Sequence, residues 1–117
     1  MKRREMIKDR KIFNNIIQTG SFFKNKFFVI YIKERKDEKI MFGIAISNKT
    51  GKAHIRNKIK RKVRAIIDNN KNLFKNNYDY IIMVRKAWIE STFTELNDSL
   101  VSLISEIKVK QWRKNLR

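Results

Sequence analysis

The chain has 117 residues, the length of one domain, and its 42% hydrophobic content is enough to bury a core and excludes a disordered basic tail. Lysine and arginine total 29 against 11 acidic residues, a net charge of +18, which favours nucleic acid as the partner over an anionic membrane surface. Lack of cysteine excludes disulfides and thiol chemistry, and no segment resembles a signal peptide or a membrane span. We expect one cytoplasmic domain, 1–117, with loose basic ends at 1–8 and 110–117.

The first predicted element is a helix, because apolar residues recur at helical spacing after Asp9, which can open it as an N-cap. The apolar positions are Ile12, Phe13, Ile16 and Ile17. Gly20 predicts the end of this helix, because glycine readily adopts the left-handed conformation of a C-terminal stop.

Two strands are expected next, over about residues 26–33 and 40–47, with a charged turn at 34–39 between them. In the first strand, side chains alternate between two faces, so Tyr31 points away from Ile30 and Ile32. In the second strand, large residues alternate with small ones such as Gly43. This alternation predicts one deeply packed face and one face that another element can approach closely.

The stretch from Lys49 to Arg64 is the most distinctive part of the sequence, because half of its positions are basic and none is acidic. Apolar residues recur through it at helical spacing, within an arc of about 120°. These residues are Ile55, Ile59, Val63, Ile66 and Ile67. On the opposite side lie Asn57, Lys60, Arg61 and Arg64. The pattern predicts a helix, reaching about Asp68, that buries an isoleucine stripe and exposes a basic face.

The start of this helix carries Lys52, His54 and Arg56, although the partial positive charge of a helix N-terminus normally favours acids. A bound anion would suit this arrangement, because unpaired N–H groups and basic side chains would converge on it. Thr50 is a candidate N-cap and Gly51 a candidate tight turn. A solvated charged face is the simpler alternative, but a run of one sign on a short, patterned helix favours a phosphate-binding face.

A third main strand over residues 78–85 and a last helix complete the predicted elements. The apolar centre of the strand, residues 80–84, suits burial on both faces. Thr92 and Glu95 form a capping box for the helix. Its apolar positions are Phe93, Leu96, Leu100, Leu103, Ile104 and Ile107. The fold class is an α+β two-layer sandwich in the order α-β-β(-β)-α-β-α, with parallel strands on either side of the basic helix.

Few residues could carry hydrolytic chemistry. His54 is the only histidine and has no carboxylate near it in the sequence, and the acids are scattered apart from Asp37-Glu38 in a turn. No cluster predicts a two-metal phosphodiesterase site. We therefore expect no catalytic residue and no metal ligand in the chain, which would bind while another molecule cleaves. Aromatic residues could stack on unpaired bases, although core packing is the more common role of a phenylalanine.

Residues 47–64 resemble the signature of the bacterial ribonuclease P protein subunit, which reads Ser-Lys-Lys-x-Gly-x-Ala-x-x-Arg-Asn-Arg-x-Lys-Arg-x-x-Arg. The chain departs from it mildly: Asn48 replaces the first lysine, and Lys58 replaces an arginine, keeping the charge but losing the bidentate fork. The order of elements agrees as well, so the resemblance covers nearly the whole chain. Physics alone favours a right-handed crossover around the basic helix, whereas the resemblance implies a left-handed one.

The resemblance implies a ribonucleoprotein endoribonuclease in which a catalytic RNA holds Mg²⁺ and removes the 5′ leader of precursor tRNA, with one protein per RNA. The protein would bind both the RNA and the leader and help the metal-dependent complex form. The catalytic RNA would contact Lys49, Lys52, Arg56, Asn57, Lys58, Lys60, Arg61 and Arg64. The leader would lie in a cleft between the first helix and the sheet, lined by Phe13, Ile17 and Tyr31, with Ile17 where the family often has phenylalanine.

Two other functions fit the composition. A small basic ribosomal protein or RNA chaperone would share the charge and fold type, and only the signature argues against it. A DNA-binding regulator could place the basic helix in a major groove, but a strand precedes this helix where a helix-turn-helix would need another helix.

Overall fold

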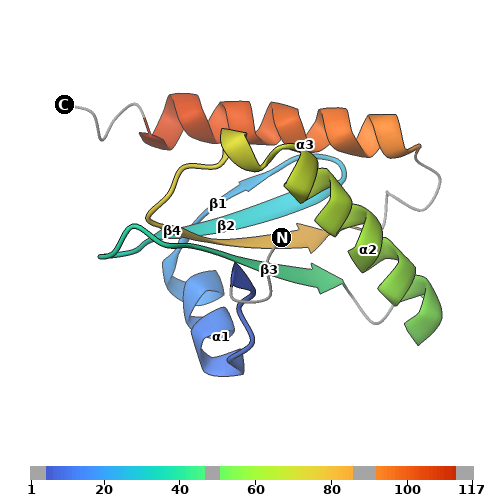
Figure 1. Ribbon diagram of the computed structural model, residues 1–117, viewed down its shortest axis with the longest axis horizontal. Coiled ribbons are helices and arrows are strands. Elements are labelled where there is room, and N and C mark those ends of the chain that lie inside the picture. The colour runs from blue at the N-terminus through green and yellow to red at the C-terminus, as the bar shows by residue number, and fades with distance from the viewer. Residues whose placement is uncertain (1–4, 47–50, 86–91, 113–117) are drawn as a thin grey trace.

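The computed structural model describes residues 5–46, 51–85 and 92–112 (Figure 1). The elements in chain order are α1 (Arg10–Thr19), β1 (Ser21–Lys24), β2 (Phe28–Glu34), β3 (Ile40–Ile46), α2 (Ala53–Asn69), a 3₁₀ turn (Lys71–Leu73), β4 (Tyr78–Val84), α3 (Phe93–Ile107) and a π-helical turn (Lys108–Trp112). This order confirms the predicted α+β class, and β1 lies before the first strand to which the prediction gives a range. Within the described ranges, no helix combines the length and the apolar character needed to cross a membrane.

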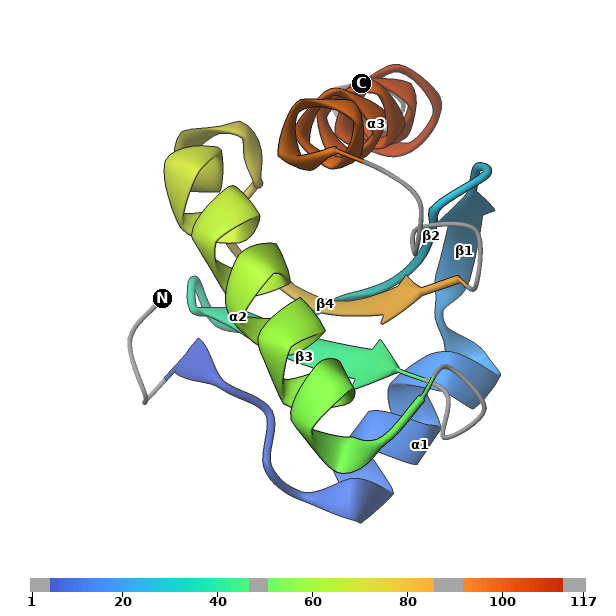
Figure 2. The ribbon, with the colours of Figure 1, turned by 90° about the vertical axis from the view of Figure 1, so that its right-hand side faces the viewer.

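The four strands form one sheet in the order β1-β2-β4-β3. Strand β4 is antiparallel to β2 and parallel to β3, so the β3–α2–β4 unit joins adjacent parallel strands, as predicted. In Figure 1 both strands run to the right with β4 above β3, and comparison with Figure 2 shows that α2 lies in front of them. This arrangement makes the crossover left-handed, the hand that the resemblance implies.

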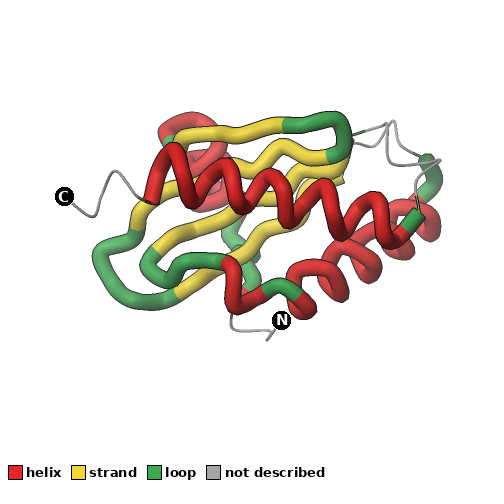
Figure 3. The backbone as a smooth tube through the Cα atoms, turned by 90° about the horizontal axis from the view of Figure 1, so that it is seen from above, coloured by secondary structure: helices red, strands yellow, loops and turns green. Residues whose placement is uncertain are grey.

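Helices α2 and α3 cover one face of the sheet, and α1 lies against the other (Figure 2). The main core lies on the α2–α3 side, where Phe28, Ile30 and Tyr80 of the sheet meet Ile59 and Leu100 of the helices. Each is fully buried, and burial of an apolar side chain of this size stabilises the fold by roughly 1.5–3 kcal/mol. Figure 3, a view from above, shows α3 lying over the strands of the sheet.

Two glycines allow α1 to lie close to the sheet. A Cβ on Gly43 would lie 2.7 Å from Cε2 of Phe13, and a Cβ on Gly20 would lie 2.4 Å from the carbonyl oxygen of Ile32. Gly20 caps α1 with φ −79°, so the predicted left-handed stop is wrong and the close approach explains the glycine instead. Asp9 is the N-cap, as predicted, and accepts a hydrogen bond from the Lys11 N–H at 2.8 Å.

The amino-terminal segment is anchored where the sequence predicts a loose end over 1–8. The Ile7 N–H donates to the Phe42 carbonyl at 2.8 Å, and Met6 forms a bridge with the same residue, because β3 offers an unpaired edge. The Lys71 ammonium donates to the Glu5 carboxylate at 2.6 Å. The prediction is therefore wrong for residues 5–7, and residues 1–4 lie outside the described ranges.

The carboxy-terminal segment differs from its prediction in the same way. Trp112 is buried, with its ring centroid 6.2 Å from that of Tyr78 and 6.3 Å from that of Tyr80. A large aromatic side chain at this position completes the core, so the predicted loose end at 110–117 is wrong for Trp112. Residues 113–117 lie outside the described ranges.

The start of α3 is as predicted, with one exception. The Thr92 side chain accepts from the Glu95 N–H at 3.1 Å while the Glu95 carboxylate accepts from the Thr92 N–H, so the capping box is complete. Phe93 is 44% exposed and does not belong to the buried face that its spacing predicts. It occupies the first position of α3, at the end of the helical layer.

Candidate nucleic-acid interface

Helix α2 is held by the isoleucine stripe that its spacing predicts. Ile59, Val63, Ile66 and Ile67 are at most 1% exposed and belong to the main core. Ile55 is 39% exposed, so its predicted burial is wrong. Its side chain lies beside Gly51 at the start of the helix instead of reaching the core.

The outward side of α2 is basic and carries no acid before its last turn. Asn57, Lys58, Arg61 and Arg64 are exposed, and Arg56 and Lys60 are half-buried at the margins of this surface. Between Ala53 and Ile67 no aspartate or glutamate interrupts it, and Asp68 is the first acid of the helix. Lysine and arginine side chains gathered on one exposed helix face create a positive potential suited to a polyanion. We call this surface, Lys52 included, the basic face.

The amino-terminal end of α2 adds to this potential. Lys52 occupies the N-cap position, makes no side-chain capping hydrogen bond, and precedes a first turn without an acid. Gly51 has φ 154°, a backbone conformation that residues with a side chain rarely adopt, which explains the glycine at this position. The partial positive charge of the helix end and the Lys52 ammonium both favour an anion here. Lys49 and Thr50, the latter predicted as the N-cap, lie outside the described residues.

A second candidate surface lies on the α1 side of the sheet. Phe22 on β1 is the register partner of Tyr31 on β2, which pairs with Ile81 on β4, which pairs with Gly43 on β3. Residues paired in this way point to the same face of a sheet. The Phe13 ring lies over Gly43 at the far end of this row. We call this set of residues the cross-strand row: Phe13, Gly43, Ile81, Tyr31 and Phe22.

The residues predicted to contact a leader all lie at this surface. Phe13, Ile17 and Tyr31 are half-buried, so each combines packing with some exposure to solvent. Ile17 follows Phe13 by four residues and therefore lies on the same side of α1. Tyr31 is separated from the Phe13 ring by Ile81, which is fully buried.

Phe22 belongs to this surface and is missed by the sequence prediction. Its side chain is 59% exposed, and its ring centroid lies 6.1 Å from that of Tyr31 at an interplanar angle of 44°. Strand β1 spans only Ser21–Lys24, too short for alternation to stand out. The available signal was the pair Phe22-Phe23, in which one residue must face away from the core if the segment is a strand.

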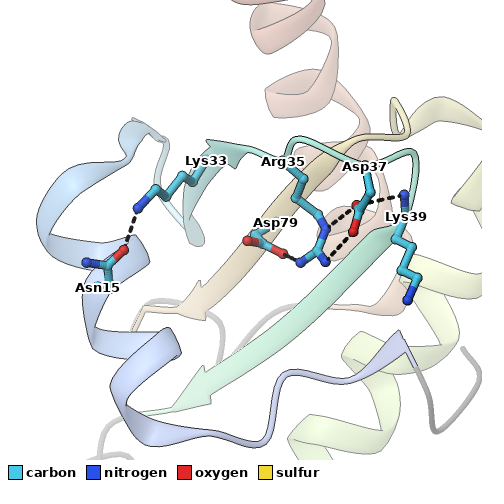
Figure 4. Close-up of polar contacts among 6 residues, drawn as sticks. All are labelled: Asn15, Lys33, Arg35, Asp37, Lys39 and Asp79. Atoms are coloured by element: carbon cyan, nitrogen blue, oxygen red, sulfur yellow. Dashed lines mark hydrogen bonds and ion pairs between the residues drawn. The ribbon is translucent and has the colours of Figure 1, made fainter.

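Polar contacts fix α1 and the β2–β3 turn beside the cross-strand row (Figure 4). The Lys33 ammonium on β2 donates to the Asn15 side chain on α1. Arg35 donates from Nη1 to Asp79 at 2.7 Å and from Nε to Asp37 at 2.8 Å, so one guanidinium holds both carboxylates. The Asp37 side chain also accepts from the Lys39 N–H at 3.1 Å.

Within the Arg35 cluster, the pKa values of Arg35 and Asp37 shift in the direction expected of an ion pair. Hydrogen bonds from Arg35 lower the pKa of Asp37 to about 2, and those hydrogen bonds in turn raise the pKa of Arg35. Asp79 is the buried acid of the cluster, 7% exposed, and Arg35 compensates its charge. The Asp37 carboxylate, whose pKa is held low in this way, is structural and does not resemble a general acid poised near neutral pH.

In the part of the chain that the structure describes, the other groups able to act in acid–base or metal chemistry lie apart from one another. His54 is exposed in the first turn of α2. Within residues 5–46, 51–85 and 92–112, no group of three or more histidine, aspartate or glutamate side chains could hold a metal ion.

Comparisons with known proteins agree on one family. The family model described as Ribonuclease P matches residues 1–108. The ribonuclease P protein component of Mycoplasma capricolum is 38% identical over 109 residues, covering 92% of this chain and all of that protein. Among solved structures, the RNase P protein of Staphylococcus aureus superposes with a TM-score of 0.81 at 30% identity, covering 90% of this chain and 96% of the other. The RNase P protein of Thermotoga maritima gives 0.80 at 30% identity, covering 89% and 98%.

Proposed function

Because this chain belongs to the ribonuclease P protein family, we propose that it is the protein subunit of a bacterial ribonuclease P and acts in 5′ maturation of tRNA. In this role it binds the catalytic RNA and the 5′ leader of precursor tRNA, one protein to each RNA, in the cytoplasm. The observation that carries the proposal is the basic face of α2, which coincides with the most specific part of the family signature. A ribosomal protein or RNA chaperone would need no such match.

The basic face is the proposed contact with the catalytic RNA. Arg61 and Arg64 are exposed and free to reach phosphates because the buried stripe on the other side of α2 already fixes the helix. The N-terminus of α2, with Lys52 and the half-buried Arg56, is the proposed site of a phosphate held by backbone N–H groups. Asn57, Lys58 and Lys60 complete this contact, and Lys49 is assigned to it from the family signature alone.

The α1 side of the sheet is the proposed contact with the leader. Phe13, Ile17 and Tyr31 are half-buried there and present apolar surface on which an unpaired nucleotide can pack. Mature tRNA has no leader, so this contact would distinguish the substrate from the product.

Chemistry is assigned to the RNA. The described residues offer no cluster of acids or histidines that fits Mg²⁺. Magnesium held mainly by the RNA would activate water and stabilise the leaving oxygen. The protein's own contribution is to position the leader and to offset the repulsion between two polyanions, which lowers the Mg²⁺ needed for the complex to form.

The test is reconstitution with the RNA transcribed from the same organism. With Mg²⁺, the protein alone is expected to leave precursor tRNA intact, and the assembled particle to cleave it at the mature 5′ end. The RNA alone should require more Mg²⁺ or salt. His54→Ala should cleave as wild type. Cleavage by the RNA-free protein, or loss of cleavage in His54→Ala with RNA and leader binding intact, would overturn the assignment.

A further inference from the structure

We propose that Phe22 and Tyr31 together form a two-ring platform on which unpaired bases of a single-stranded RNA leader stack, an inference that rests on the proposed function. Phe22 thereby extends the leader contact from β2 to β1. The residues that the family resemblance implies for the leader contact are Phe13, Ile17 and Tyr31, and Phe22 is not among them.

The exposure of Phe22 is the first reason. A single exposed aromatic residue is ordinary on a protein surface. Phe22, however, is the most exposed large hydrophobic residue of the described ranges, at 59%, and it lies in register beside a half-buried Tyr31. Its place at the end of the cross-strand row, and not its exposure alone, connects it with the proposed leader contact.

The geometry of the two rings is the second reason. Their centroids are 6.1 Å apart and their planes are inclined by 44°, so the rings touch without stacking on one another. Phe22 therefore keeps an open face for a base. From Gly43, under the Phe13 ring, to Phe22 the row crosses three strand spacings of about 4.8 Å each. This span of about 14 Å is long enough for more than one nucleotide of an extended strand.

The charges beside the platform are the third reason. Lys24 lies two residues after Phe22 on β1, and Lys33 lies two residues after Tyr31 on β2, so both belong to the same face as the rings. The Lys33 ammonium already donates to Asn15, and the acid opposite it in the register, Asp79, is paired with Arg35, so Lys24 is the exposed cation beside the rings. Rings flanked by cations suit an unpaired nucleotide, whose base stacks while its phosphate meets a lysine.

The experiment uses the assembled particle of this protein and its RNA, with precursor tRNAs whose leaders lengthen one nucleotide at a time. The affinity of the wild-type particle should rise when the leader becomes long enough for a nucleotide to reach Phe22. Phe22→Ala should abolish this rise, which is about fivefold or more for one stacked base. An abasic nucleotide at that position should reduce the affinity of the wild-type particle by the same factor as Phe22→Ala does. It should not reduce the affinity of the Phe22→Ala particle any further. Affinity for mature tRNA should not change.

Three further variants separate stacking from stability. Phe22→Trp should retain the gain, whereas Phe22→Leu, which keeps apolar cover on the strand, should lose it even if Phe22→Ala is poorly folded. Phe93→Ala is the matched control, because it removes an exposed phenylalanine from α3 on the opposite side of the sheet. It should bind precursor tRNA as wild type.

Two results would overturn the platform. One is a Phe22→Leu particle that responds to leader length as wild type does, and the other is an equal loss for precursor and mature tRNA. If the wild-type particle itself shows no preference for precursor over mature tRNA, the proposed function fails. If that preference is present and Phe22 variants leave it intact, only the platform fails.

Discussion

The ring of Phe13 on α1 lies directly over Gly43 on β3, so close that a Cβ at position 43 would come within 2.7 Å of the ring edge. The small residue and the aromatic residue are complementary partners across the helix–sheet interface. Their contact fixes the height of α1 above the sheet, and thereby the shape of the surface where the leader is proposed to lie.

Gly43→Ala should therefore push α1 away from the sheet. Overpacking of this kind costs about 1–3 kcal/mol, and the low end is expected because a half-buried ring can shift. Gly20→Ala should cost more, because its Cβ would meet the carbonyl oxygens of Ile32 and Ile16, which belong to the backbone. Urea denaturation of both variants measures which of the two loses more unfolding free energy.

A double-variant cycle tests the cause of the first effect. Phe13→Leu removes the ring edge, so Gly43→Ala should cost at least ~0.5 kcal/mol less in the Phe13→Leu background than in wild type. Strictly additive losses of unfolding free energy would mean that the Phe13 ring is not what makes a side chain at position 43 unfavourable.

Tyr31→Ala should weaken binding of precursor tRNA by the assembled particle by roughly 1–3 kcal/mol if one base stacks fully on the ring. Binding of mature tRNA should stay nearly unchanged. Paired binding measurements beside a melting curve distinguish this role from a packing role. A purely packing role would lower the melting temperature and weaken both substrates equally.

On the basic face, Arg61→Ala and Arg64→Ala should each weaken RNA binding and reduce the slope of log affinity against log salt by up to about one unit. Both side chains are exposed, so circular dichroism should show an unchanged fold. Lys108→Ala, which removes an exposed lysine beyond the end of α3, is the charge-matched control. An equal effect of Lys108→Ala on the slope would mean that net charge, and not the basic face, governs binding.

Acid should weaken the β2–β3 turn through Asp37. Its pKa is lowered from 3.8 to about 2 by Arg35, so the folded state binds this proton less readily than the unfolded state. The stabilisation is fully present above about pH 4 and is lost as pH falls towards 2. Asp37→Asn should flatten the dependence of unfolding free energy on pH in this window only. Glu38→Gln, a neighbouring change that leaves the hydrogen bonds of Arg35 intact, should retain the wild-type dependence.

Trp112→Ala should destabilise the fold by about 3 kcal/mol, because it removes a buried ring that packs on Tyr78 and Tyr80. Trp112→Phe is the milder comparison. It keeps most of the ring and removes an indole N–H that is buried without a hydrogen-bond partner among the described residues. Thermal unfolding that is the same in wild type and Trp112→Ala would show that this end of the chain adds little to the core.

The sequence predicts the elements with strong periodicity. The α2 stripe from Ile59 to Ile67, the buried strand β4 and the α3 capping box all depend on local spacing, and the structure confirms them. Ile55 shows the limit of such reasoning. It fits the helical arc, but α2 extends beyond the core at its first turn, and periodicity carries no information about where a partner layer ends.

Contacts between distant parts of the chain could not be predicted. The local pattern predicts a left-handed helix stop at Gly20, whereas the structural reason for this glycine lies on β2, in the carbonyl of Ile32. The basic neighbours of Ile7 and Trp112 predict loose ends, because the residues they contact, Phe42 and Tyr80, are far away in sequence. The exposed position of Phe22 escapes prediction because the four residues of β1 give too short a pattern.

The position of β4 between β2 and β3 determines when the sheet can form during synthesis. Strands β2 and β3 do not pair with each other. Each pairs instead with β4, residues 78–84, which is synthesised after both. Until these residues leave the ribosome, the hairpin of β1 and β2 and the basic helix have no sheet on which to pack. The four-stranded sheet should therefore form only after β4 has been made, and the exposed cationic segments would meanwhile be able to contact nearby polyanions, the ribosome's own RNA among them.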